Sequence, residues 1–170
     1  MKVTITGGRG FLGSHVADEL SKRGHKVKIF DKKKSKWLSS GQKMYVGSIL
    51  DRRKLSLAIK GCDFVYHFAA LVNMNFARTN PFMSAKINIL GTINALLVSE
   101  MHKVKRFIHA SSIYANTEEG GFYGSSKKAA ENYIERFHQT FGLKYTILRF
   151  GSLYGSRADE LNGINIIINK

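Results

Sequence analysis

The stretch that decides the fold is Thr-Gly-Gly-Arg-Gly-Phe-Leu-Gly at residues 6–13, near the start of the 170-residue chain. It follows a β-branched run at residues 2–6, and residues 11–23 after it carry apolar side chains at nearly helical spacing. In such a turn Gly7 permits the tight bend, Gly10 lets the backbone approach a pyrophosphate, and Gly13 lets helix and strand pack closely. The pattern is typical of a dinucleotide-binding turn, and a purely structural glycine turn is the alternative.

Strands and helices alternate along the rest of the chain. Apolar runs predict strands at residues 25–30, 44–46, 64–68, 104–110 and 144–150, and helices at residues 51–59, 81–102 and 122–141. Neither repeats nor low-complexity segments interrupt this order. The alternation predicts an α/β protein with a doubly wound parallel sheet, the Rossmann fold, of about six strands flanked by helices.

Composition excludes several classes of protein. A hydrophobic fraction of 44% is that of a globular domain, and a single cysteine, Cys62, excludes an internal disulfide and a thiolate metal cluster, so we expect no metal site. The net charge of +15 favours polyanionic partners. The basic residues lie in short clusters without a basic tail or interleaved aromatic residues, so we do not expect a dedicated nucleic-acid binder.

The sequence also bears on membranes and location. The apolar stretch at residues 87–98 is interrupted by Asn88, Gly91, Thr92 and Asn94, and is too short to span a bilayer. The N-terminus has no apolar signal-peptide region. We therefore expect a cytoplasmic protein that does not contact membranes.

Asp31 stands at the end of the second predicted strand, about 20 residues beyond the glycines. A carboxylate at this point accepts hydrogen bonds from the adenosine ribose, although it could instead cap the following loop. It repels a 2′-phosphate and so favours NAD, whereas Lys32, Lys33 and Lys34 would attract one. We therefore expect NAD, with NADP as the less favoured cofactor.

Tyr123 and Lys127 open a predicted helix at a spacing that places both on one face. Ser111 and Ser112 end the preceding strand, so the three side-chain types can meet beside a nicotinamide. A neighbouring ammonium and an oxidised nicotinamide both favour a tyrosine phenolate, which could exchange a proton with a substrate hydroxyl as hydride moves. For His67 and His109, which lie in apolar strands, we predict packing in the core.

Seven motifs occur in a fixed order along nearly the whole chain: TGGRGFLGSH, Asp31, YHFAA at residues 66–70, Asn88 in NILGT, HASS, YGSSK and LRFGSLYG. In this order they resemble the extended short-chain dehydrogenase/reductase superfamily, specifically its NAD-dependent epimerase/dehydratase family, which acts on nucleotide sugars. The resemblance implies transient oxidation of a sugar carbon by hydride transfer to NAD. It also implies a nucleotide-sugar substrate and a possible homodimer formed through a helical bundle.

The resemblance further implies a role for each matching residue. Ser112, Tyr123 and Lys127 would be catalytic, with Ser111 as the alternative serine. Tyr123 and Lys127 would also contact the cofactor, Lys127 through the nicotinamide ribose. The remaining cofactor-binding residues would be Gly7, Gly10, Phe11, Leu12, Gly13, Asp31, Lys32, Ser48, Ile49, Phe68, Ala69, Ala70 and Asn88.

The sequence departs from the family pattern after Gly47, in the loop before Tyr123, and in the C-terminal substrate region. Gly47 is followed by Ser48, where the family has an acidic residue that contacts adenine. Only 10 residues separate Ser112 from Tyr123, so the family's longer, proline-bearing substrate loop is missing. We expect residues 1–155 to form the NAD(P)-binding Rossmann domain and residues 156–170 to begin a missing C-terminal substrate region. The alternatives are a non-catalytic NAD(P)-binding sensor, a basic nucleic-acid-associated module of the same fold, or an inactive truncated product.

Overall fold

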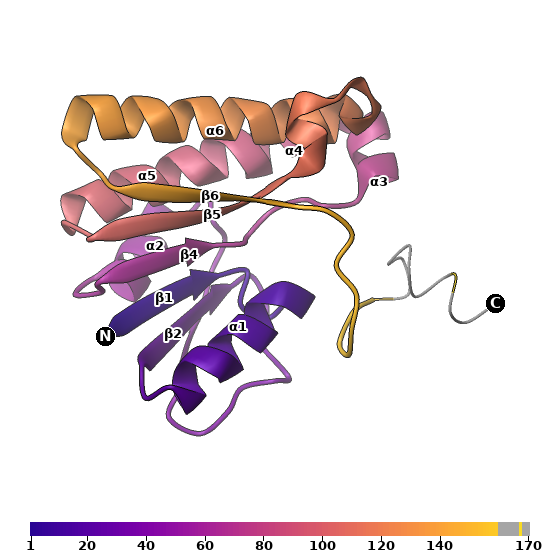
Figure 1. Cartoon of the computed structure of the whole chain (residues 1–170). Helices are drawn as coiled ribbons and strands as arrows, with labels where there is room; N and C mark the ends of the chain where they lie inside the picture. The colour runs from indigo at the N-terminus through magenta and orange to yellow at the C-terminus, as the bar shows by residue number, and fades with distance from the viewer. Residues whose placement is uncertain (160–166, 168–170) are drawn as a thin grey trace.

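A computed structural model of the protein describes residues 1–159 and 167, and Figure 1 shows how its elements are arranged. Six strands form one sheet, and every neighbouring pair runs parallel. The strands are β1 (Lys2–Thr6), β2 (Lys26–Asp31), β3 (Lys43–Val46), β4 (Phe64–His67), β5 (Arg106–Ser112) and β6 (Tyr145–Phe150). Their order is β3-β2-β1-β4-β5-β6, so the direction of winding changes between β1 and β4. The predicted Rossmann fold with six parallel strands is confirmed.

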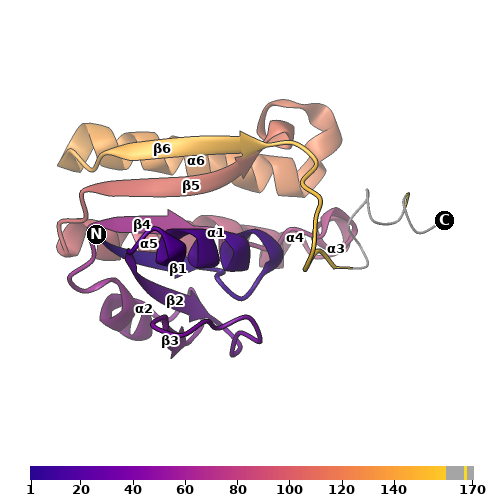
Figure 2. The same ribbon diagram turned by 60° about the horizontal axis from the view of Figure 1, so that its bottom comes forward.

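Helices cover both faces of the sheet (Figure 2). Among the described residues, α1 (Phe11–Lys22) lies alone on one face, against β1 and β2. On the other face α2 (Arg52–Ile59), α5 (Gly91–Met101) and α6 (Gly121–Phe141) pack side by side. Neighbouring side chains of β2 face opposite sides of the sheet: Ile29 packs with Ala17 of α1, whereas Phe30 joins the larger core under the three helices, with Val65 and Phe107. Each such burial contributes about 1.5–3 kcal/mol.

Local signals in the sequence set several of the helix ends. Asp51 caps α2 by accepting a hydrogen bond from the backbone N–H of Lys54 at 3.1 Å. Gly142 ends α6 in the left-handed conformation, with φ at +71°. Pro81 is the first residue of α4 (Pro81–Ser84), as predicted.

The structure differs from the prediction in three places. The long helix predicted from Pro81 is divided into α4, the π-helical turn η1 (Ala85–Leu90) and α5, and a further helix, α3 (Met74–Thr79), precedes it. Two short 3₁₀ turns, η2 (Ile113–Asn116) and η3 (Glu118–Gly120), join β5 to α6. The fifth strand begins at Arg106 rather than at residue 104, because the N–H of Val104 closes the end of α5 by bonding to the carbonyl of Ser99 at 2.9 Å.

The helical run from Pro81 to Met101 is long and apolar enough to cross a membrane by length and composition alone, with a mean hydropathy of 1.3 in its most apolar window. The prediction that this apolar stretch is too short to span a bilayer is therefore wrong on length and composition, because the helical run extends beyond residues 87–98 on both sides. Within the fold, α5 packs against α2 and α6, and Ala95 and Leu96 are fully buried. We interpret the run as a core helix of the α/β fold, whose apolar composition serves that packing.

Candidate functional site

The glycine turn after β1 is the first part of the site. Gly7 has φ at +72° and donates its N–H to the carbonyl of Phe30 at 2.9 Å. A Cβ on Gly7 would lie 2.6 Å from the backbone nitrogen of Ala69, and one on Gly13 would lie 2.4 Å from the carbonyl oxygen of Gly7. Side chains are therefore excluded at both positions by close backbone packing, as predicted.

The third glycine of the turn, Gly10, is placed differently. Within 4 Å, a Cβ on Gly10 would meet a single described atom, the carbonyl oxygen of Gly7, at a distance of 3.3 Å. Gly10 is the N-cap residue of α1. Because glycine has no side chain, no side chain caps the first N–H groups of the helix. Uncapped N–H groups beside an open backbone surface form a binding site for a phosphate anion. The turn therefore has the shape and the donors that a pyrophosphate requires, with Phe11 and Leu12 beginning the helix.

Asp31 lies at the end of β2, next to this turn. Its carboxylate accepts hydrogen bonds from the backbone N–H groups of Arg9 at 3.2 Å and Lys33 at 3.3 Å. Asp31 thus caps its loop, as the alternative interpretation required, and also faces the glycine turn. Lys32, Lys33 and Lys34 are exposed around it.

The other residues predicted to line the cofactor differ in how far they are exposed. Ser48 is exposed, and its hydroxyl accepts the N–H of Leu50 at 3.2 Å. Phe68, Ala69 and Ala70 follow β4 and are partly buried beside the glycine turn.

Ile49 is 6% exposed, belongs to the core under α2 and α5, and packs on Gly91. Its side chain serves the core, and its carbonyl accepts a hydrogen bond from Asn94 Nδ2 at 3.3 Å.

Asn88 has a scaffold role that the sequence did not reveal. It lies in η1, is 2% exposed, and accepts the N–H of Leu71 at 2.7 Å. Its amide nitrogen donates to the carbonyl of Leu71 at 3.0 Å and to the hydroxyl of Ser126 at 2.9 Å. Because both amide N–H groups are used within the protein, Asn88 fixes the chain after β4 against α6.

Tyr123 and Lys127 share one face at the start of α6, as their spacing predicts. The Nζ atom of Lys127 lies 5.8 Å from the centroid of the Tyr123 ring and donates to the carbonyl of Ala110 at 2.8 Å. Burial lowers the pKa of Lys127 to about 8, while the charge of Glu131 acts in the opposite direction. The bond to Ala110 is the one hydrogen bond that Lys127 Nζ makes among the described residues, and an ammonium carries three N–H donors.

The tyrosine differs from the expectation. Burial raises the pKa of Tyr123 above its usual value, and a hydrogen bond with Ser112 opposes this rise. Lys127 makes no resolved contribution to the pKa of Tyr123, and burial is the largest cause of its shift. Tyr123 is therefore a protonated phenol at rest, in contact with Ser112.

A buried cluster explains why Ser112 rather than Ser111 faces the tyrosine. The two serines point to opposite faces of β5. The Ser111 hydroxyl donates to Glu131 at 2.5 Å, and Arg149 of β6 donates to both oxygens of the same carboxylate, at 2.9 and 2.7 Å. Burial alone would raise the pKa of Glu131, but the hydrogen bonds from Arg149 and Ser111 lower it. Glu131 was missed in the sequence, although it stands one helical turn after Lys127.

A continuous chain of buried hydrogen bonds joins the glycine turn to α6. His67 lies at its centre, 2.8 Å from the Thr6 hydroxyl through Nδ1 and 3.0 Å from the Thr92 hydroxyl through Nε2. Burial and the Lys127 charge lower the pKa of His67 to about 3, so it is neutral. The chain runs through Thr6, His67, Thr92, Asn88, Ser126 and the carbonyl of Tyr123.

His109 lies beside this chain, with its ring stacked 5.5 Å from that of His67. Both histidines are buried, which confirms the prediction that they pack in the core. Neither ring nitrogen of His109 has a hydrogen-bond partner among the described residues. His109 therefore contributes to packing and takes no part in the chain.

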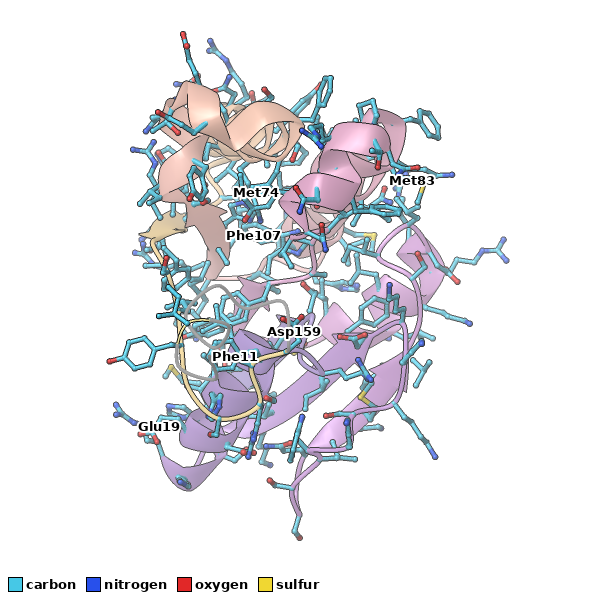
Figure 3. The ribbon with its side chains drawn as sticks, turned by 90° about the vertical axis from the view of Figure 1, so that its right-hand side faces the viewer. Phe11, Glu19, Met74, Met83, Phe107 and Asp159 are labelled. Atoms are coloured by element: carbon cyan, nitrogen blue, oxygen red, sulfur yellow. The ribbon has the colours of Figure 1, made fainter. Side chains whose placement is uncertain are left out.

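The glycine turn, Asp31 and Ser112 lie at the carboxyl ends of β1, β2 and β5. The edge toward which the strands point faces the viewer in Figure 3. At this edge the winding of the sheet changes direction between β1 and β4, which is where parallel α/β sheets bind ligands. A model of the NAD dependent epimerase/dehydratase family matches residues 3–169. The chain belongs to this family.

Individual relatives agree with this assignment. The chain is 31% identical to a putative UDP-glucose 4-epimerase of Methanocaldococcus jannaschii, over 99% of the chain and 62% of the relative. It superposes on the UDP-glucose 4-epimerase of Thermus thermophilus in complex with NAD, with a TM-score of 0.90 and 28% identity, over 99% of the chain and 61% of that structure. The UDP-glucose 4-epimerase of Thermotoga maritima with UDP-glucose gives a TM-score of 0.89 and 33% identity, over 98% and 61%.

This epimerase/dehydratase chain spans about three fifths of the length of these relatives. Its glycine turn, the uncapped start of α1 and Asp31 together fit a dinucleotide, because they offer an open phosphate site beside a carboxylate for a ribose. Ser156 and Arg157, which follow the predicted domain end at residue 155, contact His15 and Asp18 of α1. Most of the predicted segment 156–170 lies outside the residues that the structure describes.

Proposed function

We propose that this protein binds NAD and oxidises a carbon of a nucleotide sugar by reversible hydride transfer, with Ser112, Tyr123 and Lys127 as catalytic residues. The observation that carries the proposal is the placement of this trio at the same edge of the sheet as the open glycine turn. The chain of hydrogen bonds through His67 and Asn88 holds the two parts in a fixed relation. Bound NAD would supply the hydride acceptor.

The protein's own groups would control the proton. Tyr123 is protonated at rest, so it would first release its own proton to solvent. As a phenolate, hydrogen-bonded to Ser112, it would then take the proton of the sugar hydroxyl as hydride leaves the sugar carbon, and return that proton in the reverse step. Ser112 would donate a hydrogen bond to the same sugar oxygen and so orient it. Lys127 is largely protonated at neutral pH and would hold the nicotinamide ribose and stabilise the phenolate as it forms.

Binding and chemistry can be tested separately. NAD at about 100 times its Kd should raise the free energy of unfolding by about 2.7 kcal/mol, which a thermal melt detects. Tyr123→Phe removes only the hydroxyl, so it should keep this stabilisation and lose hydride transfer from UDP-glucose, followed by NADH absorbance. If NAD and NADP both leave the melting temperature unchanged, cofactor binding is refuted. If Tyr123→Phe is as active as the wild type, the role of the tyrosine is refuted.

A homodimer formed through α5 and α6 stays a proposal. Its support is a set of exposed apolar side chains on these two helices, with Met101 of α5 55%, Phe122 of α6 52% and Phe141 of α6 54% exposed. Light scattering during size-exclusion chromatography tests it, and a monomer at all concentrations would refute it.

A further inference from the structure

The segment after β6 returns to α1. Figure 1 shows it leaving the carboxyl end of β6 and descending to the region of α1. The residues of α1 that receive it, Phe11, His15 and Asp18, are spaced so that they share one face of the helix. Two parts of the chain separated by more than a hundred residues are thus in contact.

Each of these α1 residues makes a specific contact. The Phe11 ring lies 3.7 Å from the place that a Cβ on Gly155 would occupy. His15 Nε2 lies 2.7 Å from the carbonyl oxygen of Ser156. Nη2 of Arg157 lies 2.8 Å from Oδ2 of Asp18, which makes an ion pair.

Arg157 also contacts the loop between β2 and β3, residues 32–42. Its guanidinium lies 4.7 Å from the centre of the Trp37 ring, a distance typical of a cation–π contact. Asp18 in turn accepts hydrogen bonds from Ser39 Oγ at 2.8 Å and Gln42 Nε2 at 3.1 Å. We call these five residues, Asp18, Trp37, Ser39, Gln42 and Arg157, the Arg157 clamp.

The clamp is partly shielded from solvent. The side chains of Arg157 and Asp18 are 21% and 18% exposed, so their charges are less screened than those of a surface pair. Burial acts to raise the pKa of Asp18, but hydrogen bonds from Arg157, Ser39 and Gln42 lower it. Arg157 has φ at +70°, which is uncommon for a residue other than glycine and indicates that surrounding contacts hold it in place.

The loop held by the clamp begins directly after Asp31, whose carboxylate faces the glycine turn. A loop that is ordered before a ligand arrives loses less conformational entropy on binding. We propose that Arg157 is a positioning residue for the adenosine side of NAD, because its contacts with Asp18 and Trp37 hold residues 32–42 against α1 and so place Asp31 and Lys32 for the ribose. The inference rests on the proposed binding of NAD.

The sequence provides its own probe, since Trp37 is the only tryptophan of the chain. The full chain is compared with Arg157→Gln, which removes the charge and the planar guanidinium, and with Arg157→Lys, which keeps only the charge. Arg53→Gln, at an exposed position on α2, is the control for the loss of one positive charge. Acrylamide quenching of Trp37 fluorescence reports the loop, and calorimetry gives the Kd of NAD.

Arg157→Gln should increase the quenching of Trp37 and raise the Kd of NAD by about fivefold or more, the lower end of typical coupling between sites. Arg157→Lys should fall between this variant and the wild type, and Arg53→Gln should match the wild type in both measurements. A wild-type Kd in Arg157→Gln overturns the inference and leaves the proposed function intact. Failure of the wild type to bind NAD overturns both.

A second variant covers the case in which Arg157→Gln does not fold, as judged by circular dichroism. Trp37→Ala removes the ring from an exposed loop position and leaves the Asp18–Arg157 ion pair in place. It should raise the Kd of NAD in calorimetry in the same direction. An unchanged Kd in this variant overturns the inference as well.

Discussion

Replacing Gly13 by alanine tests the close contact between α1 and β1. The new Cβ would lie 2.4 Å from the carbonyl oxygen of Gly7 and 2.7 Å from the Cα of Gly8. Both are backbone atoms, so the clash can be relieved only by moving α1 away from β1. Overpacking of this kind costs about 1–3 kcal/mol, and we take the upper end because no side chain can move aside. Alanine regains about 1 kcal/mol of helix propensity, which leaves a net loss of about 2 kcal/mol.

Thermal unfolding measures this loss. A domain of this size loses roughly 2–4 °C in Tm for each kcal/mol, so Gly13→Ala should melt about 4–8 °C below the wild type. Gly151→Ala is the matched control, because a Cβ there would meet no atom within 4 Å, and its Tm should change by less than about 2 °C. Equal melting temperatures for Gly13→Ala and Gly151→Ala would refute the packing argument.

Gly10→Ala separates binding from packing in the same turn. A Cβ there would lie 3.3 Å from the carbonyl oxygen of Gly7, so the fold should tolerate it with a loss below about 1 kcal/mol. The methyl group would occupy the open surface proposed for the pyrophosphate, and the rise in Tm that NAD produces should be lost. A rise equal to that of the wild type would show that the phosphates bind elsewhere.

Three further predictions concern the interior of the site. Ser112→Ala should lower kcat by about a hundredfold or more, whereas Ser111→Ala should mainly lower stability because it removes a donor to Glu131; equal losses of kcat would contradict this assignment. The pKa of Lys127 is lowered to about 8 by burial, so the unfolded chain binds more protons than the native one up to its usual pKa of 10.5, and stability should rise with pH across that window. Lys127→Met should abolish this rise, of about 3 kcal/mol, in denaturant titrations, and an unchanged slope would contradict a buried ammonium. His109→Leu removes two unpaired nitrogens and should stabilise the fold by about 1 kcal/mol at neutral pH. Burial also holds the pKa of His109 well below 6.5, so the gain should grow as pH falls through that value, and a loss of stability at low pH would contradict it.

Much of the fold was predictable because its signals are local. Glycines with positive φ at the turn and at the end of α6, the Asp51 cap and Pro81 each act within a few residues of their position. The positions of α3 and of the π-helical turn η1 were not predicted. They depend on contacts with α6, such as the bond from Asn88 to Ser126, which joins residues 38 apart in sequence.

The sequence by itself determined the alternation of strands and helices, the glycine turn, and a candidate site of Tyr123 and Lys127 with Ser111 or Ser112, because periodicity and motif spacing are properties of neighbouring residues. Only the tertiary structure decided which serine meets the tyrosine, since Glu131 and Arg149 take Ser111 from two other elements. It also decided that burial raises the pKa of Tyr123 and lowers that of Lys127. These properties depend on which segments exclude water from a group, and that is set by packing between residues far apart in the chain.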